Sequence, residues 1–206
     1  MHSNPAFRQQ STDDNLAFAR QRGFGQLALN GENGPLISHI PFLLATDGAS
    51  LDLHLARPNP ILKALATPQP AVIAVLGPDG YISPDWYGMD DQVPTWNYVA
   101  VHLRGTLLLA PPDGLAAHLD QLSARFEGGL APKTPWTSAK MSPGTMERML
   151  RAIVPCRLTI TAVEGTWKLG QNKPPAARAR AARHLAAAAI GADQPALAAL
   201  MNPNPG

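Results

Sequence analysis

Cysteine is nearly absent from this chain, since Cys156 is the only one in 206 residues. A single cysteine rules out an internal disulfide and a cysteine-based zinc site. Its place in an apolar stretch predicts a small, buried strand residue instead. Other metal sites are not indicated either, because the histidines expected on strands, His39, His54 and His102, follow no recognised ligand spacing.

Charge is also scarce. Asp, Glu, Lys and Arg make up 16% of the residues, and the formal net charge is +2. So small an excess of positive charge argues against a nucleic-acid surface. Much of the surface must therefore be uncharged or covered by a partner subunit. No apolar run reaches the roughly 18 residues of a membrane span, and the first residues contain no apolar signal segment, so we expect a cytoplasmic protein without membrane contact.

Glycine and proline are abundant, with 17 and 21 residues spread along the chain. They indicate many turns between short elements. Hydrophobic patterning predicts strands at 24–29, 36–44, 50–56, 71–77, 96–109 and 156–169. Helices are expected at 12–22, 61–66, 111–127, 143–154 and from 174 onward.

The expected strands are mostly adjacent in sequence and linked by hairpins, without regular β-α-β alternation. This order predicts a mainly β (α+β) fold: a six-stranded antiparallel barrel with peripheral helices. No second domain is indicated. We expect a barrel domain over residues 1–185 and an alanine-rich helical tail over 186–206.

A first group of residues with binding potential lies at 54–60, where an expected strand ends and a short helix begins. Asn59 is a good N-cap and Pro60 a good first helical residue. The backbone amides that follow Pro60 would then point free N–H groups outward. Arg57 beside them could bind an oxyanion through two N–H bonds. The pattern is compatible with a phosphate cradle. The alternative is an ordinary capped helix with a surface arginine.

Two further groups lie at the ends of expected strands. Thr95, Trp96 and Asn97 begin the long strand together with Tyr98, and such a cluster can hydrogen-bond the edge of a planar ring and stack beside it. The segment 167–173 ends the last strand with two amides and two amines. The alternatives are a core tryptophan with a turn-capping asparagine, and a polar turn before the tail helix.

Six blocks of the chain together resemble one family, the PaiB-type FMN-binding negative transcriptional regulators. The resemblance covers roughly residues 5–185. Its blocks are SHIPF (38–42), HLARPNP (54–60), YISPDWY (81–87), VPTWNYVAVHLRG (93–105), MLRAIV (149–154) and WKLGQNKP (167–174). The resemblance implies an FMN-binding split β-barrel, similar to that of pyridoxamine-phosphate oxidases. It also implies a homodimer that holds FMN at the subunit interface.

The resemblance assigns roles residue by residue. His39, Ile40 and Pro41 would lie near the flavin ring, and Asn59 would start the helix beside the site. His54, Leu55, Ala56 and Arg57 would run along the ribityl chain and phosphate. Thr95, Trp96 and Asn97 would approach from the long strand. Lys168, Gln171, Asn172 and Lys173 would close the site.

The chain departs from the family pattern at two places near its end. Gly170 stands where the family often has serine, which removes a hydroxyl contact. Ala177 and Arg178 replace a common Asp-Arg pair, so the docking of the tail is expected to differ.

Three functions remain open at this point. The resemblance implies an FMN-binding repressor of transcription. The basic helix face formed by Arg178, Arg180 and Arg183 could contact DNA, but three charges are few. A flavin-dependent oxidoreductase is the alternative, with His39, His54 and Tyr98 as candidate acids or bases. The third is a dimeric module that has lost flavin and holds another planar ligand such as haem.

Overall fold

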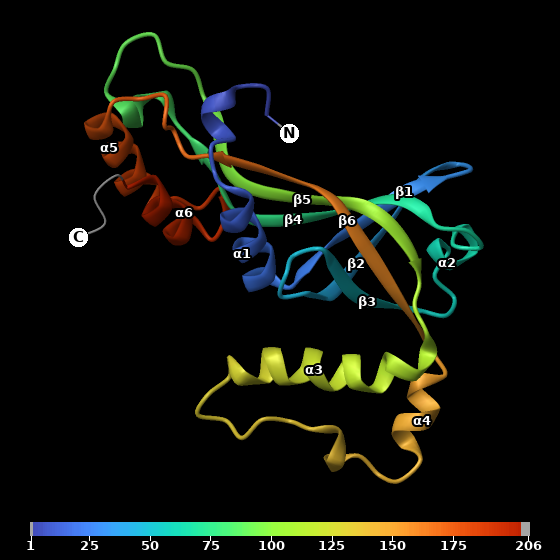
Figure 1. The fold of residues 1–206 in the computed structure, drawn as a ribbon. Helices are drawn as coiled ribbons and strands as arrows, with labels where there is room; N and C mark the ends of the chain where they lie inside the picture. Colours follow the sequence, from blue (N-terminus) through green and yellow to red (C-terminus); the bar gives the residue numbers. More distant parts are fainter. Residues whose placement is uncertain (1, 203–206) are drawn as a thin grey trace. The chain divides into compact units, whose positions relative to one another are not determined.

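The computed structural model describes residues 2–202 (Figure 1). Its strands are β1 (Phe24–Gly31), β2 (Gly34–Leu44), β3 (Ser50–Ala56), β4 (Gln69–Ile82), β5 (Thr95–Leu109), β6 (Ile153–Lys168) and β7 (Gly191–Ala192). Its α-helices are α1 (Thr12–Arg22), α2 (Ile61–Ala64), α3 (Leu115–Gly128), α4 (Thr145–Leu150), α5 (Pro175–Ala186) and α6 (Gln194–Met201).

The strands form one sheet in the order β1-β2-β3-β6-β5-β4-β7. An additional pairing joins β1 directly to β4, the sixth strand in this order. Six strands therefore close into a ring, as the expected barrel requires. The pairings of β1 with β2 and β4, and of β3 with β2 and β6, are antiparallel. The predicted six-stranded antiparallel barrel is confirmed. The sequence did not predict β7, which has only two residues and so carries no hydrophobic alternation.

The strands alternate between core and outer face because successive side chains point to opposite sides. On β3, Leu51, Leu53 and Leu55 are buried, whereas Asp52 and His54 lie on the opposite, partly exposed face. This is the predicted alternation. Cys156 is also buried, and burial raises the pKa of its thiol to about 12, so it is an unreactive strand residue at neutral pH.

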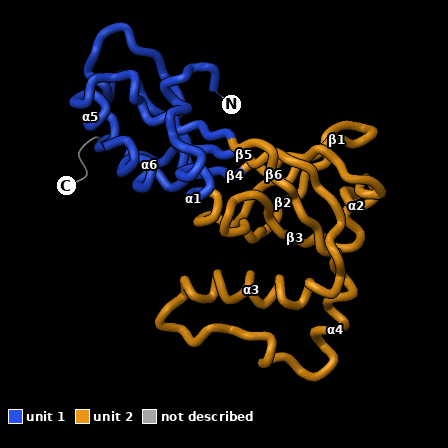
Figure 2. Tube along the Cα trace, viewed as in Figure 1, with its two compact units in different colours: residues 1–18, 75–102, 164–206 blue, residues 19–74, 103–163 orange. Residues whose placement is uncertain are grey.

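The chain divides into two compact units, each built from several segments (Figure 2). Unit 2 comprises residues 19–74 and 103–163 and holds α2, α3 and α4. The described part of unit 1 comprises residues 2–18, 75–102 and 164–202 and holds α5 and α6. In its core, α5 contributes Leu185, while Leu197 and Met201 of α6 are fully buried. The expected domain boundary at residue 185 stays a prediction.

Local sequence signals explain where α1 begins and ends. The Ser11 hydroxyl accepts a hydrogen bond from the Asp14 N–H at 3.0 Å, which caps the first turn as predicted. The helix ends before Gly23, which has a φ of 59°. A left-handed residue at this position is typical of helix C-termini and suits glycine.

The helix expected at 143–154 is shorter than predicted. It ends at Leu150, and Ile153 and Val154 already belong to β6. The pairing of Val154 with Leu55 and of Ile153 with Ala56 decides this, because β-branched side chains fit a sheet better than a frayed helix end. Tertiary pairing therefore overrides a weak helical pattern.

Among the described residues, no helix combines the length and apolar character needed to cross a bilayer. Nor does any cluster of three or more histidine, cysteine, aspartate or glutamate residues within 2–202 suit a metal ion.

Candidate functional site

The residues predicted to bind the cofactor fall into two groups, one in each unit. The unit 2 group comprises His39, Ile40, Pro41, His54, Leu55, Ala56, Arg57 and Asn59. The unit 1 group comprises Thr95, Trp96, Asn97, Lys168, Gln171, Asn172 and Lys173.

Asn59 organises the turn between β3 and α2. Its Oδ1 accepts the Ile61 N–H at 3.0 Å, and its Nδ2 donates to the Ser38 hydroxyl of β2 at 3.0 Å. This side chain holds the turn, but it is not the predicted N-cap: Pro60 takes that position, and α2 begins at Ile61. The expected free amides are not found, because the Leu62 and Lys63 N–H groups also donate to backbone carbonyls. An anion at this corner would have to be held by a side chain.

Arg57 is the cation at that corner. Its Nε donates to the Arg151 carbonyl at 2.8 Å, and its Nη2 lies 3.5 Å from the Ile153 carbonyl. The side chain is exposed and lines a cavity of about 560 Å³, formed with residues 109–116 and 150–155. These two bonds leave further guanidinium N–H groups for other acceptors, since arginine carries five donors.

His54 pairs with His118 of α3. The two ring nitrogens, Nδ1 of His54 and Nε2 of His118, lie 3.4 Å apart, with the rings edge to face. Burial lowers the pKa of both imidazoles, and for His54 the neighbouring His118 lowers it further. Asp52, on the same face of β3, forms a two-point ion pair with Arg157 at 2.6 and 2.9 Å. The charge of Asp52 raises the pKa of His118, but burial outweighs it, so both imidazoles favour the neutral form at pH 7.

The remaining residues of the unit 2 group alternate along their strands. Ile40 and Leu55 are buried in the barrel core, at 3% and 2% exposure. His39 and Ala56 are exposed, and Pro41 is half-buried. Of these residues, Ile40 and Leu55 can reach a ligand outside the barrel through their backbone groups only.

In unit 1, the start of β5 sends successive side chains in opposite directions. Trp96 is 46% exposed and meets Tyr81 edge to face at 6.4 Å, whereas Asn97 is 1% exposed and its Nδ2 lies 3.4 Å from the Met201 sulfur. The Thr95 hydroxyl accepts a hydrogen bond from the Lys168 ammonium. Burial lowers the pKa of Lys168. The cluster thus presents an indole, a hydroxyl and a partly desolvated amine.

The segment after β6 is folded back on itself. Gln171 accepts the Leu169 N–H at 2.8 Å, while Asn172 is exposed. Lys173 hydrogen-bonds Gln92, and its ammonium lies 5.4 Å from the centre of the Tyr87 ring. Tyr87 and Gln92 were not predicted as site residues. The family-like block 81–87 was the available signal for Tyr87, and Gln92 lies in a loop without a pattern.

The arginines of α5 are partly used within unit 1. Arg180 donates from Nε to the Trp86 carbonyl at 3.3 Å. Its guanidinium occupies the space that a Cβ atom at Gly88 would need. Trp86 in turn stacks on His184, with ring centres 5.8 Å apart. Arg183 is exposed. The expected basic face therefore serves in part to dock α5 on the turn at 84–88.

The neutral histidine pair predicts how stability depends on pH. In the unfolded chain both imidazoles titrate near 6.5, whereas in the fold their pKa values are lower. Below pH 6.5 the unfolded state binds more protons, so the free energy of unfolding should fall as the pH drops below 6.5 and level off below the folded pKa values. Urea unfolding at several pH values measures this. His118→Gln should make the decline shallower, and an unchanged slope would exclude the pair as its source.

Comparison with known proteins gives concordant results. Residues 1–162 match the family described as "Putative FMN-binding domain". The Bacillus subtilis protein "Protease synthase and sporulation protein PAI 2" is 28% identical over 81% of this chain and 80% of its own length. The FAD and haem binding protein of Mycobacterium smegmatis aligns with a TM-score of 0.59 and 21% identity, covering 90% of this chain and 82% of that one.

A second solved structure, the flavocytochrome Anf3 of Azotobacter vinelandii, aligns with a TM-score of 0.58 and 14% identity, over 81% of this chain and 72% of that one. These likenesses confirm the split-barrel fold, and the family match confirms FMN as the expected cofactor. Because the match spans residues 1–162, this chain belongs to the FMN-binding domain family.

Proposed function

We propose that this chain is an FMN-binding protein that acts as a homodimer and as a negative regulator of transcription. The observation that carries the proposal is the family match over residues 1–162. In unit 2, Arg57 is proposed to bind the phosphate, with His54, Leu55 and Ala56 along the ribityl chain and Asn59 holding the turn. His39, Ile40 and Pro41 are proposed to lie near the ring system.

Arg57 fits a phosphate ligand on physical grounds. It lines the cavity of about 560 Å³ together with Arg151, and two of its own N–H groups are held by backbone carbonyls. A guanidinium that is already oriented loses less side-chain entropy when it binds an anion. Asn59 supports this corner by tying the turn to Ser38.

The unit 1 group suits the polar edge of a flavin. Lys168 offers an ammonium on a half-buried stem, with Thr95 beside it, and Trp96 offers an exposed aromatic face. Asn97, Gln171, Asn172 and Lys173 are proposed as the remaining contacts. When bound, FMN would supply electron-transfer chemistry, and these residues would orient it.

Two features support a homodimer. Charged residues make up only 16% of the chain. In the segment 93–96, Val93 is 73% exposed and Trp96 is 46% exposed. Exposed apolar residues of this size near a proposed ligand site are typical of subunit contacts. Size-exclusion chromatography with light scattering should give twice 21.9 kDa.

The regulatory role rests on the resemblance and on a relative that is named for protease synthesis and sporulation. Because Arg180 binds the Trp86 carbonyl and Arg178 is half-buried, α5 has few free charges for phosphates of DNA. We therefore propose that regulation works through the flavin or a partner protein. Binding to a promoter fragment should be lost near physiological salt.

The absorbance spectrum of the isolated protein tests the cofactor. We expect a yellow protein with flavin bands, which releases FMN on heating, as identified by mass. A colourless protein that takes up no added FMN would refute the proposal. A Soret band without flavin would instead support haem as the planar ligand.

A second candidate function is a flavin-dependent oxidoreductase, favoured by the Lys168–Thr95 pair. Burial lowers the pKa of this amine, which makes it a better proton donor than an exposed lysine. Bleaching of the flavin by NADPH without oxygen, slowed in Lys168→Met, would favour this function. A flavin that stays oxidised under these conditions would count against it.

A further inference from the structure

Unit 2 contains a further cavity, of about 340 Å³. We call it the methionine cavity, after the three methionines that line it. Its lining residues are His54, Leu119, Asp120, Ser123, Trp136, Met141, Met146, Met149 and Ile153. Of these, only His54 belongs to the predicted flavin group.

The walls of the methionine cavity suit an aromatic occupant. Met141, Met146 and Met149 are half of the six methionines in the chain, and they come from the segment that carries α4. Methionine side chains are flexible and polarizable, and their sulfur atoms make favourable contacts with aromatic rings. Met149 is 57% exposed, so the cavity has an opening to solvent beside it.

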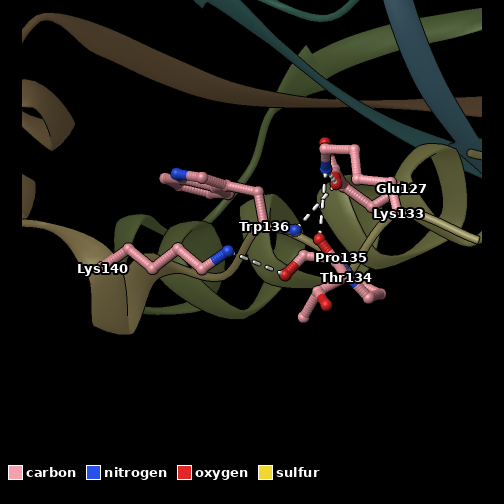
Figure 3. Close-up of polar contacts among 6 residues, drawn as sticks. All are labelled: Glu127, Lys133, Thr134, Pro135, Trp136 and Lys140. Carbon is pink, nitrogen blue, oxygen red and sulfur yellow. Dashed lines mark hydrogen bonds and ion pairs between the residues drawn. The ribbon is translucent and has the colours of Figure 1, made fainter.

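The segment that covers the cavity is held in place by hydrogen bonds (Figure 3). Oε2 of Glu127, in α3, accepts the Trp136 backbone N–H at 2.7 Å and a bond from the Lys133 ammonium. The Lys140 ammonium donates to the Pro135 carbonyl at 3.3 Å. These bonds hold the Pro135–Trp136 peptide at both its carbonyl and its N–H group, so this wall exists before a ligand binds. A preformed wall lowers the ordering entropy that binding must overcome.

The polar groups of the methionine cavity exclude anions. Its imidazole, His54, is neutral and already bonded to His118 at 3.4 Å. Its only carboxylate, Asp120, is exposed at the rim. No lysine or arginine is among its lining residues. A carboxylate or phosphate ligand would therefore lack a counter-charge and would meet the negative charge of Asp120.

We propose that the methionine cavity binds an uncharged aromatic molecule of one or two rings that carries a hydroxyl group for His54. The cavity volume lies at the lower end of the range of about 300–1,000 Å³ for ligand pockets. A three-ring flavin with its phosphate is too large and carries the wrong charge. The ligand proposed here therefore differs from FMN, although His54 lines this cavity and is also among the residues proposed to contact FMN.

Labelling the methionine methyl groups with carbon-13 tests the proposal in the full, FMN-loaded protein. Titration with 2-naphthol should shift the methyl signals of Met141, Met146 and Met149 in a saturable way. The signals of Met89 and Met201, which do not line the cavity, should stay in place. The anion 2-naphthoate should cause no saturable shift.

Two variants give a matched comparison. Ser123→Phe places a ring in the cavity and should weaken 2-naphthol binding at least tenfold. Ala124→Phe, at the exposed neighbouring position of α3, should leave the affinity unchanged. Equal effects of the two variants would contradict the proposal.

Other outcomes also overturn it. If the three methyl signals do not respond, or if Met89 and Met201 respond equally, the cavity is no specific site. Release of FMN by 2-naphthol would mean that the cavity belongs to the flavin. If the methyl signals shift with protein concentration but not with added 2-naphthol, a second copy of the chain covers the methionine cavity.

Discussion

Replacing Arg57 with alanine is expected to weaken FMN binding by about 1.5–3 kcal/mol, the range for hydrogen bonds to charged groups. This corresponds to a rise in Kd of roughly ten- to a hundredfold. The reason is the loss of an exposed guanidinium that is held at the mouth of a cavity by the Arg151 carbonyl. Titration of the apoprotein with FMN, followed by flavin fluorescence, measures the change.

A comparison with riboflavin separates a phosphate contact from a structural role. Riboflavin has no phosphate, so Arg57→Ala should leave its affinity nearly unchanged if Arg57 binds that group. Equal losses for FMN and riboflavin would mean that the variant loosens the start of β6, which Arg57 also contacts. Arg151→Ala is the matched control, because it removes the second guanidinium that lines the same cavity but keeps the carbonyl that Arg57 uses. Unchanged FMN affinity in Arg57→Ala would refute the assignment.

Replacing Gly105 with alanine is expected to destabilise the fold by about 3 kcal/mol, since overpacking of this kind is among the costly core changes. A Cβ at Gly105 would lie 1.9 Å from the Thr159 carbonyl oxygen and 3.1 Å from the Ile160 Cα. These are backbone atoms of β6, so no side-chain rotation relieves the clash, and β5 and β6 would have to move apart. Thermal unfolding should show a fall in Tm of about 6–12 °C for a chain of this size.

Gly114→Ala is the control for this variant. A Cβ at Gly114 would meet nothing within 4 Å, and its backbone φ of −80° suits any residue. Its effect should stay within about 0.5 kcal/mol, as for most surface substitutions. If Gly105→Ala unfolds at the temperature of the unchanged protein, the close approach of β5 and β6 in unit 2 is wrong.

Much of the architecture could be predicted from local pattern. The alternation of Leu51, Leu53 and Leu55 predicted β3, and Ser11 with Gly23 marked the ends of α1, because these signals act over one or two turns of chain. The six ordered blocks also sufficed to predict the family and its cofactor. Local pattern failed at Ile153, which joins β6, since pairing with Ala56 some hundred residues earlier decided its conformation.

The site residues named from the sequence stay a prediction, and several of their contacts differ from those expected. Asn59 was expected to leave amides free for an anion, yet the turn satisfies those of Ile61, Leu62 and Lys63 itself. The pairing of His54 with His118 gave no signal in the sequence, because the two residues lie on different elements. Their meeting depends on where α3 packs, which no short-range pattern encodes.

The amino-acid sequence by itself determined the order of the six barrel strands, the family and the kind of cofactor, because these follow from short-range periodicity and from blocks of neighbouring residues. Only the tertiary structure decided which polar groups are already paired, which are buried and which line a cavity. The physical reason is that hydrogen bonds and desolvation depend on residues far apart in the chain, such as Asp52 with Arg157 or Thr95 with Lys168.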